Sequence, residues 1–278
     1  MPQGVDVLVI DSSSKDDTTE VAYAYDFSVE IIPSADFNHG GTRNLGVKKC
    51  SADIVVFLTQ DAIVEKGSIK KIVEAFTDPD VVCAYGRQLP HLQANPLAVH
   101  AREFNYKSSS YTGSLKTKDS LGLKTIFMSN SFSAYRVSTF YQLGGFPENT
   151  ILCEDMFFAA KAVLAEYKVA YVADATARHS HNYSALEEFK RYFDIGVFHY
   201  DESWIRDSFG GAGGEGKKFI ISETMYLVKN APLWIPKACI HNVAKIIGYK
   251  LGLNYKKFPL KWRKKLSMHK RYWDSISN

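Results

Sequence analysis

The feature that most constrains the fold is an alternation of short apolar runs with helical patterns. The runs are rich in β-branched and aromatic side chains, which is typical of strands buried on both faces. They are Val5–Ile10, Val29–Ile32, Ile54–Leu58 and Val81–Tyr85. Helical patterns at Thr42–Lys49 and Ser68–Phe76 separate some of them. Strands that alternate with helices predict an α/β protein with a doubly wound, mostly parallel sheet.

The second half of the chain continues this pattern and then becomes helical. Ile126–Tyr135 and Val169–Ala173 predict strands, and Glu154–Ala165 predicts a helix between them. The remainder is mostly helical by its periodicity and carries many basic residues. We therefore expect an α/β domain that carries the chemistry at residues 1–200, followed by a helical, basic extension at residues 201–278.

Composition limits the class of protein. The chain has 278 residues, of which 46% are hydrophobic and 23% charged, as in a globular protein with a substantial core. Its net charge of +4 is too small to indicate nucleic-acid binding. The four cysteines form no CxxC pair, which argues against a zinc site or a disulfide framework. Without a signal peptide or a bilayer-spanning apolar run, we expect a cytoplasmic protein whose membrane contact is at most peripheral.

Two acidic residues stand where predicted strands end. Asp11 follows the first apolar run, and Asp61 follows the sequence IVVFLTQ. In doubly wound sheets, ligands bind at the carboxyl ends of the strands. A carboxylate there could hold a divalent cation that neutralises a diphosphate leaving group. The alternative for Asp61 is an ordinary aspartate in a turn.

Two further polar groups could carry chemistry. Glu154 and Asp155 open a helix, where a carboxylate could deprotonate an acceptor hydroxyl. Acids at a helix start also complement the helix dipole, and that alternative stays open. His179 and His181 end a strand and could bind a metal or a phosphate, although histidines in such loops are often ordinary polar residues.

A series of motifs in a fixed order resembles the family 2 glycosyltransferases, in particular the bacterial rhamnosyltransferases of surface polysaccharide synthesis. The motifs are DSSSKDDT (Asp11–Thr18), FNHGGTRNLG (Phe37–Gly46), TQDA (Thr59–Ala62), SNSFSAYR (Ser129–Arg136), GGFPE (Gly144–Glu148), ED (Glu154–Asp155), HSHNYS (His179–Ser184) and YFDIGVFH (Tyr192–His199). The resemblance covers roughly residues 5–200. It implies the GT-A fold, which is a nucleotide-sugar-binding α/β fold.

The resemblance also implies roles for individual residues in binding the nucleotide sugar. Those expected to bind it are Asp11, Ser13, Arg43, Asn44, Gln60 and Asp61. Asp11 would contact the nucleoside, and Arg43 the base or the phosphates. Asp61 stands at the last position of the family's DXD-type motif, whose first aspartate is missing here.

The same resemblance implies a metal site and a catalytic base. Asp61 would bind Mg²⁺ or Mn²⁺ beneath the diphosphate, with His181, or less favourably His179, completing the site. Asp155 would be the catalytic base and Glu154 its partner.

The beginning of the chain departs from the family pattern. Family members carry a strand-loop-helix unit before the segment that matches Val5. We expect this chain either to lack that unit or to begin at an internal methionine of a longer protein. A chain without the unit is expected to lose one wall of the nucleoside pocket, with reduced stability.

The basic C-terminal segment admits two interpretations. Ile240, Val243 and Ile247 recur at helical spacing, and basic residues over 256–271 are interleaved with aromatic residues. This pattern fits an amphipathic anchor on an anionic membrane surface. It equally fits a helical cap on the catalytic domain with a solvated basic face. RNA binding has no recognised module behind it, so we expect no nucleic-acid partner.

Taken together, the sequence predicts an inverting, metal-dependent glycosyltransferase. It would move L-rhamnose from dTDP-L-rhamnose to a glycan or lipid-linked glycan acceptor. One alternative is a GT-A-like binding or scaffold protein with impaired catalysis, and another is a nucleotidyltransferase. Asp155 and the GGFPE loop count against both, because neither needs a base for an acceptor hydroxyl.

Overall fold

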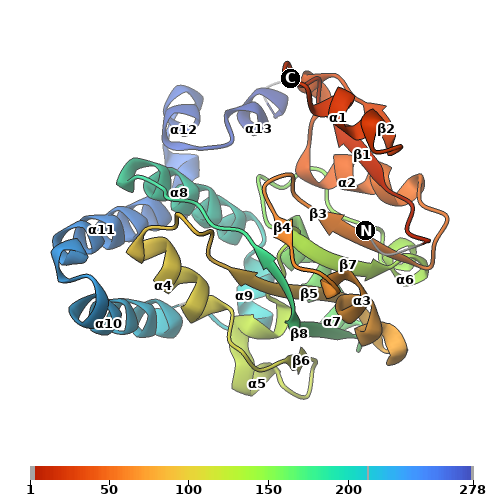
Figure 1. The fold of residues 1–278 in the computed structure, drawn as a ribbon. Coiled ribbons are helices and arrows are strands. Elements are labelled where there is room, and N and C mark those ends of the chain that lie inside the picture. The colour runs from red at the N-terminus through yellow and green to blue at the C-terminus, as the bar shows by residue number, and fades with distance from the viewer. Residues whose placement is uncertain (1–3, 212, 277–278) are drawn as a thin grey trace.

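The chain folds into two sheets surrounded by helices (Figure 1). The computed structural model describes residues 4–211 and 213–276. The strands are β1 (Leu8–Asp11), β2 (Ser28–Ile31), β3 (Ile54–Leu58), β4 (Ile63–Val64), β5 (Val81–Leu89), β6 (Tyr111–Gly113), β7 (Phe132–Arg136) and β8 (Lys168–Arg178). The α-helices are α1 (Thr18–Ala24), α2 (His39–Lys48), α3 (Ser68–Glu74), α4 (Pro96–Asn105), α5 (Lys118–Leu121), α6 (Val137–Gln142), α7 (Glu154–Leu164), α8 (Ala185–Asp201), α9 (Ser203–Phe209), α10 (Gly213–Asn230), α11 (Ile235–Gly252), α12 (Leu260–Leu266) and α13 (Lys270–Ser275).

The larger sheet has the order β3-β7-β5-β8-β4, with β6 also paired to β8. Its central strands β5 and β8 run parallel, and the remaining pairs are antiparallel. The sheet is therefore mixed rather than mostly parallel as expected: among the described residues, its one parallel pair lies at the centre and every other pair is antiparallel. β5 is almost entirely buried, as the apolar run Val81–Tyr85 predicts.

Alternate residues of β8 face two different hydrophobic clusters, because side chains alternate across a strand. Tyr171 and Ala173 belong to the cluster that contains Phe158 of α7, whereas Ala170 belongs to the cluster that contains Ile72 of α3. The sheet thus lies between α7 on one face and α3 on the other. This layered arrangement is the α/β architecture that the alternation of elements predicts.

The first two strands form a separate parallel pair. β1 aligns Leu8 with Ser28 and Asp11 with Ile31 of β2. Among the described residues, neither β1 nor β2 pairs with the larger sheet. The residues at the carboxyl end of β1, such as Asp11, are therefore not positioned by the strand pairing of the larger sheet.

Helix α11 packs closely along α8, which ends at the predicted domain boundary. A Cβ at Gly248 would lie 2.2 Å from the Phe189 carbonyl oxygen, and one at Gly252 would lie 2.1 Å from that of Phe193. Only glycine permits such close backbone contact. The C-terminal helices are therefore docked on the α/β domain along α8.

The last two helices extend from α8 to the β1–β2 end of the molecule (Figure 1). Asp194 of α8 accepts a hydrogen bond from the Met268 backbone N–H at 2.8 Å. The Arg271 guanidinium donates to the Ser34 carbonyl oxygen at 2.8 Å. Trp273 is fully buried beside Tyr255 and Tyr272, with ring centroids 5.4 and 5.2 Å away. The burial of these aromatic side chains therefore supports the interpretation of the segment as a helical cap.

We expect Trp273→Ala to lower the free energy of unfolding by about 3–5 kcal/mol, because it removes a fully buried large side chain. Trp262→Ala is the matched control, since Trp262 is 53% exposed in the same segment. It should change stability by less than about 1 kcal/mol. Denaturant unfolding of both variants measures the difference. Equal stability of the two would contradict the packing described for Trp273.

Candidate active site

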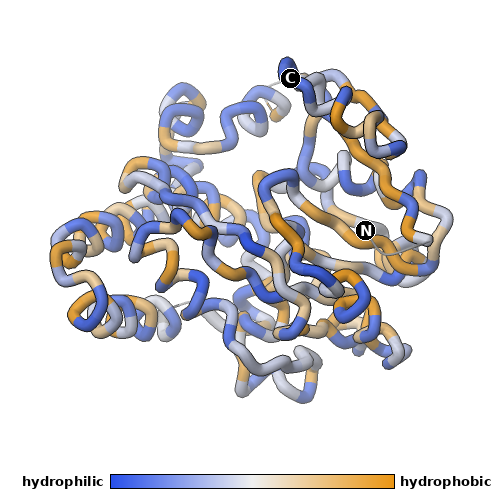
Figure 2. Tube along the Cα trace, viewed as in Figure 1, coloured by the Kyte–Doolittle hydropathy of each residue, from blue (hydrophilic) through white to orange (hydrophobic). Residues whose placement is uncertain are grey.

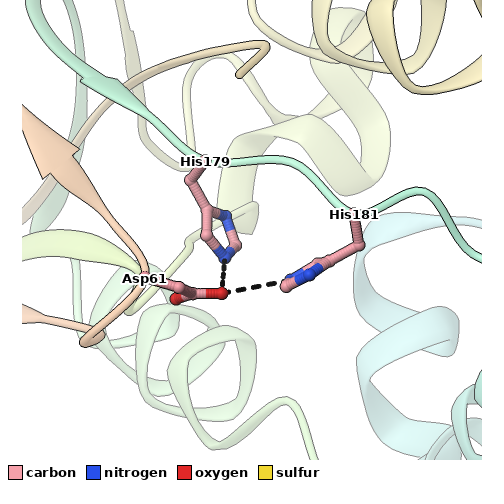
Figure 3. A group of neighbouring side chains, drawn as sticks. All are labelled: Asp61, His179 and His181. Atoms are coloured by element: carbon pink, nitrogen blue, oxygen red, sulfur yellow. Dashed lines mark ion pairs between the residues drawn. The ribbon is translucent and has the colours of Figure 1, made fainter. Parts of the chain in front are cut away.

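Asp61 and two histidines meet at one end of the larger sheet (Figure 3). Asp61 follows β3, and His179 and His181 follow β8. The Asp61 Oδ2 atom lies 3.3 Å from Nε2 of His179 and 3.6 Å from Nε2 of His181. One ligand atom from each residue lies within 4.8 Å of the other two. The strands β3 and β8 thus bring together a carboxylate and two imidazoles that are far apart in sequence.

Gln88 fixes the orientation of His179. Gln88 is 2% exposed at the end of β5, where its Nε2 donates to the Ser129 hydroxyl at 2.6 Å. The Arg102 guanidinium donates to Gln88 Oε1. His179 Nδ1 lies 3.0 Å from the same oxygen, so Nδ1 must carry the proton that it donates. The lone pair of the neutral ring is therefore on Nε2, which faces Asp61.

This arrangement suits a cation. Burial lowers the pKa of His179 to about 4 despite the opposing effect of Asp61. Burial also lowers the pKa of His181. At neutral pH the Nε2 lone pair of His179 therefore faces the ionised Asp61 oxygen, an unfavourable contact that a metal ion between them would relieve. The hydrogen bond from Nδ1 to Gln88 is the kind of outer contact that orients histidine ligands.

A second group lies at the start of α7. Cys153 precedes the helix with a φ of 61°, in the left-handed region that non-glycine residues rarely adopt. Such backbone strain is common at functional sites. Glu154 and Asp155 follow in the first helical turn. The sequence prediction of two acids at a helix start is confirmed.

Glu154 is buried and tightly bonded. Its Oε1 accepts from the Arg43 guanidinium at 2.9 Å and from the Asn130 side-chain amide at 2.8 Å. Burial alone would raise the pKa of Glu154, but Arg43 and His39 lower it overall. Arg43 also donates to the His39 carbonyl oxygen at 3.1 Å. Glu154 is thus an ionised carboxylate held in a salt bridge.

Asp155 has the opposite electrostatic environment. Burial and the neighbouring Glu154 charge raise the pKa of Asp155 to about 7, although backbone N–H groups oppose the shift. Its Oδ2 accepts from the Asn130 backbone N–H at 3.0 Å, and its Oδ1 from that of Met156 at 2.8 Å. Two adjacent carboxylates with diverging pKa values are typical of sites with distinct acid–base roles. A group that titrates near neutral pH is suited to take up a proton.

Ser129 and Asn130, which are adjacent in the sequence, connect the cluster of Asp61 and the histidines with the carboxylates of α7. Ser129 bonds to Gln88 beneath His179, whereas Asn130 bonds to both Glu154 and Asp155. The oxygen of the Asn130 side chain also accepts from the Ser133 and Tyr135 hydroxyls, both at 2.8 Å. Asn130 is therefore held through its backbone N–H, its side-chain nitrogen and its side-chain oxygen.

Other predicted residues are engaged differently. The Asn44 amide bonds to the backbone of Phe146 through both its oxygen and its nitrogen, at 2.9 and 3.0 Å. It therefore anchors the GGFPE loop. Gln60, next to Asp61, is exposed.

Asp11 and Ser13 lie on the separate β1–β2 unit. Asp11 is buried, and its Oδ2 accepts from the Ser14 backbone N–H at 2.9 Å. Ser13 has a φ of 60°, and its hydroxyl donates to the Ile32 carbonyl oxygen at 2.8 Å. These bonds are local to the unit and hold the loop after β1 in shape.

Sequence reasoning gave no role to Gln88 and Asn130, and it favoured His181 over His179. A signal was present for Gln88, since it is a polar residue in the apolar run VVCAYGRQL. Asn130 lies within the motif SNSFSAYR, but nothing in the local pattern shows what it bonds.

The α/β fold, the cluster of Asp61 with two histidines and the carboxylate pair at the start of α7 define a sugar-transferring enzyme of the GT-A type. The comparisons with known proteins agree. Residues 2–144 match the family model described as glycosyl transferase family 2, and the chain belongs to this family. It is 56% identical over 273 residues to the O-antigen chain rhamnosyltransferase RfbN of Salmonella typhimurium, covering 97% of this chain and 87% of that protein. It is 53% identical over 272 residues to the O-antigen chain rhamnosyltransferase WbaN of Salmonella anatum, covering 97% and 86%.

Among solved structures, the mannosyltransferase PcManGT from Pyrobaculum calidifontis, in complex with GDP-Man and Mn²⁺, aligns with a TM-score of 0.53. The alignment covers 98% of this chain and 76% of that one at 17% sequence identity, which supports the fold alone. The predicted fold class, family and enzyme class are confirmed.

Proposed function

We propose that this glycosyltransferase moves L-rhamnose, with inversion, from dTDP-L-rhamnose to a hydroxyl of a glycan or lipid-linked glycan acceptor in O-antigen synthesis. The chemistry is supported most directly by Asp155, a fixed carboxylate that titrates near neutral pH beside an ionised partner. A single displacement requires such a base. The sugar is suggested by the O-antigen rhamnosyltransferases that share more than half of the residues of this chain.

Asp61, His179 and His181 would hold a divalent cation. When bound, the cation supplies positive charge that stabilises the departing nucleoside diphosphate. Imidazole ligands suit transition metals, whereas Mg²⁺ prefers oxygen ligands. With two imidazoles among three ligands, the set favours Mn²⁺ over Mg²⁺.

Glu154 and Arg43 would act indirectly, by setting the pKa and the position of Asp155. The ionised Glu154 keeps the pKa of Asp155 high, and Asn130 holds both carboxylates in place. Because Arg43 is committed to Glu154, we assign it to this positioning role rather than to the phosphates alone.

The remaining predicted residues would form the donor pocket. Asp11 and Ser13 would contact the nucleoside from the β1–β2 unit. Asn44 would act by holding the GGFPE loop, and Gln60 would lie beside the diphosphate. We place the reaction in the cytoplasm, with peripheral contact at the inner membrane surface where a lipid-linked acceptor is available.

Donor hydrolysis and transfer assays test this function. We expect turnover of dTDP-L-rhamnose in the presence of Mn²⁺, and none of UDP-glucose. Asp155→Asn serves as the inactive control, and NMR of the product determines whether the anomeric configuration is inverted. Turnover of UDP-glucose without turnover of dTDP-L-rhamnose would overturn the sugar assignment.

A further inference from the structure

Helices α10 and α11 each turn an apolar face to solvent. The exposed apolar residues are Ile221, Met225 and Val228 on α10, Leu233 in the turn between the helices, and Ile240, Val243, Ile246 and Ile247 on α11. They recur at helical spacing and are 45–92% exposed. We call this set the α10–α11 face. The helices contact one another, since Asn242 donates to Glu223, and they lie at the edge of the molecule away from β1 and β2 (Figures 1 and 2).

The fold itself does not need these side chains. The buried residues of α11 are small or polar: Ala238, His241, Gly248 and Gly252. Helix α10 packs inward through Leu227, which joins Leu97 of α4 in a small cluster. Ile235 and Leu251, at the two ends of α11, pack against hydrophobic clusters. The apolar residues between them, Ile240, Val243, Ile246 and Ile247, lie on its outer side. A surface helix ordinarily shows the reverse pattern, and contiguous exposed apolar surface marks an interaction site.

The charge on the helices that form this face is positive. From Thr224 to Gly252 the sequence contains four lysines and no Asp or Glu. Lys229, Lys237 and Lys250 are exposed on the helices themselves. The nearby acids on α10 are engaged, because Glu223 is buried and Glu215 pairs with Lys124 and Lys218. Lys245 of α11 pairs with Glu188. The face therefore combines exposed apolar side chains with the three exposed lysines.

We propose that the α10–α11 face lies on an anionic lipid bilayer, with the two helices in the plane of the interface. Apolar side chains flanked by lysines are the pattern of interfacial helices. The lysines are complementary to anionic headgroups and would repel the same face of a second copy. An RNA partner would leave the apolar residues unexplained. No described helix is long and apolar enough to cross a bilayer.

This inference goes beyond the proposed reaction and identifies the membrane-binding surface. The basic, aromatic segment at 256–273 is the other candidate. Trp273 is buried there, and Phe258 and Tyr272 are partly buried, leaving Trp262 as its exposed tryptophan. The apolar contribution to binding therefore comes from α10 and α11.

Vesicle sedimentation of the full chain tests the proposal. We expect binding to phosphatidylcholine vesicles that contain phosphatidylglycerol, and weak binding to phosphatidylcholine alone. The variant Met225→Gln/Ile240→Gln/Ile247→Gln should reduce binding at least about tenfold, because it removes buried apolar area at the interface. The variant Lys229→Gln/Lys250→Gln should reduce it about fivefold per lysine at low salt.

The matched control replaces three equally exposed residues elsewhere, as Val21→Gln/Tyr25→Gln/Tyr141→Gln, and should bind like the wild type. Wild-type binding by the α10–α11 triple variant would overturn the proposal. So would absence of vesicle binding by the wild type, or a dimer in sedimentation equilibrium that the triple variant abolishes. Vesicle binding by Asp155→Asn should match the wild type, so failure of the proposed reaction and failure of this surface are separate results.

Discussion

Asp155→Asn is expected to reduce kcat by about 10²- to 10⁴-fold while donor affinity stays within about twofold of the wild type. The acceptor hydroxyl loses its proton as it attacks, and the amide cannot accept that proton. The wild type should also lose activity as pH falls below about 7, because the proposed base is the ionised form of Asp155, whose pKa is raised to about 7. A pH profile of kcat/KM measures this limb.

The substitution has a structural cost that must be separated from the chemical one. Both Asp155 oxygens accept backbone N–H groups, so an amide leaves one donor without an acceptor, at about 1–3 kcal/mol. Glu187→Gln is the matched control, since Glu187 is also an acid in a first helical turn and caps α8. It should lose stability and keep its kcat. A folded Asp155→Asn enzyme with wild-type kcat would refute the assignment of the base.

Asp61→Ala is expected to remove most of the effect of Mn²⁺ on nucleotide binding. Loss of an outer contact to a ligand typically costs 10- to 100-fold in metal affinity, and loss of a ligand itself should cost at least about as much. The remaining imidazoles lose the carboxylate that lies 3.3 and 3.6 Å from them. Calorimetric titration with dTDP, with and without Mn²⁺, measures the change.

Gln60→Ala is the control for this variant, because Gln60 is the exposed neighbour of Asp61 and lies outside the cluster of three. It should keep the dependence on Mn²⁺. If nucleotide affinity still rises with Mn²⁺ as in the wild type when Asp61 is replaced, the metal site must lie elsewhere. A parallel titration with Mg²⁺ tests the preference for Mn²⁺, which should bind more tightly.

Much of the architecture could be predicted from local pattern. The run Ile54–Leu58 is β3 without change, and Val81–Tyr85 forms the first part of the longer strand β5. The sequence points to Asp61 and Asp155 because Asp61 lies soon after a strand and Asp155 lies at a helix start. The ends of strands and helices depend on residues close in sequence, so hydrophobic periodicity predicts them.

The partners within the site required the tertiary structure. Arg43 and Glu154 are 111 residues apart, and Gln88 and His179 are 91 apart. Each contact depends on which strands pair and in what register, so composition and spacing carry no direct signal for it. Local pattern therefore gives no role to Gln88 and Asn130 and does not show that Arg43 pairs with Glu154.

The C-terminal segment is a second case in which the sequence pattern alone does not decide the structure. Its sequence established a basic, aromatic helical region, but the same residues suit a membrane surface and a packed cap. Trp273 is buried and Trp262 is exposed, although both are tryptophans among basic residues. Sequence therefore predicted several of the strands and helices and the acids near their ends. Tertiary packing decided which side chains meet and which face solvent, because burial depends on distant segments that no local pattern encodes.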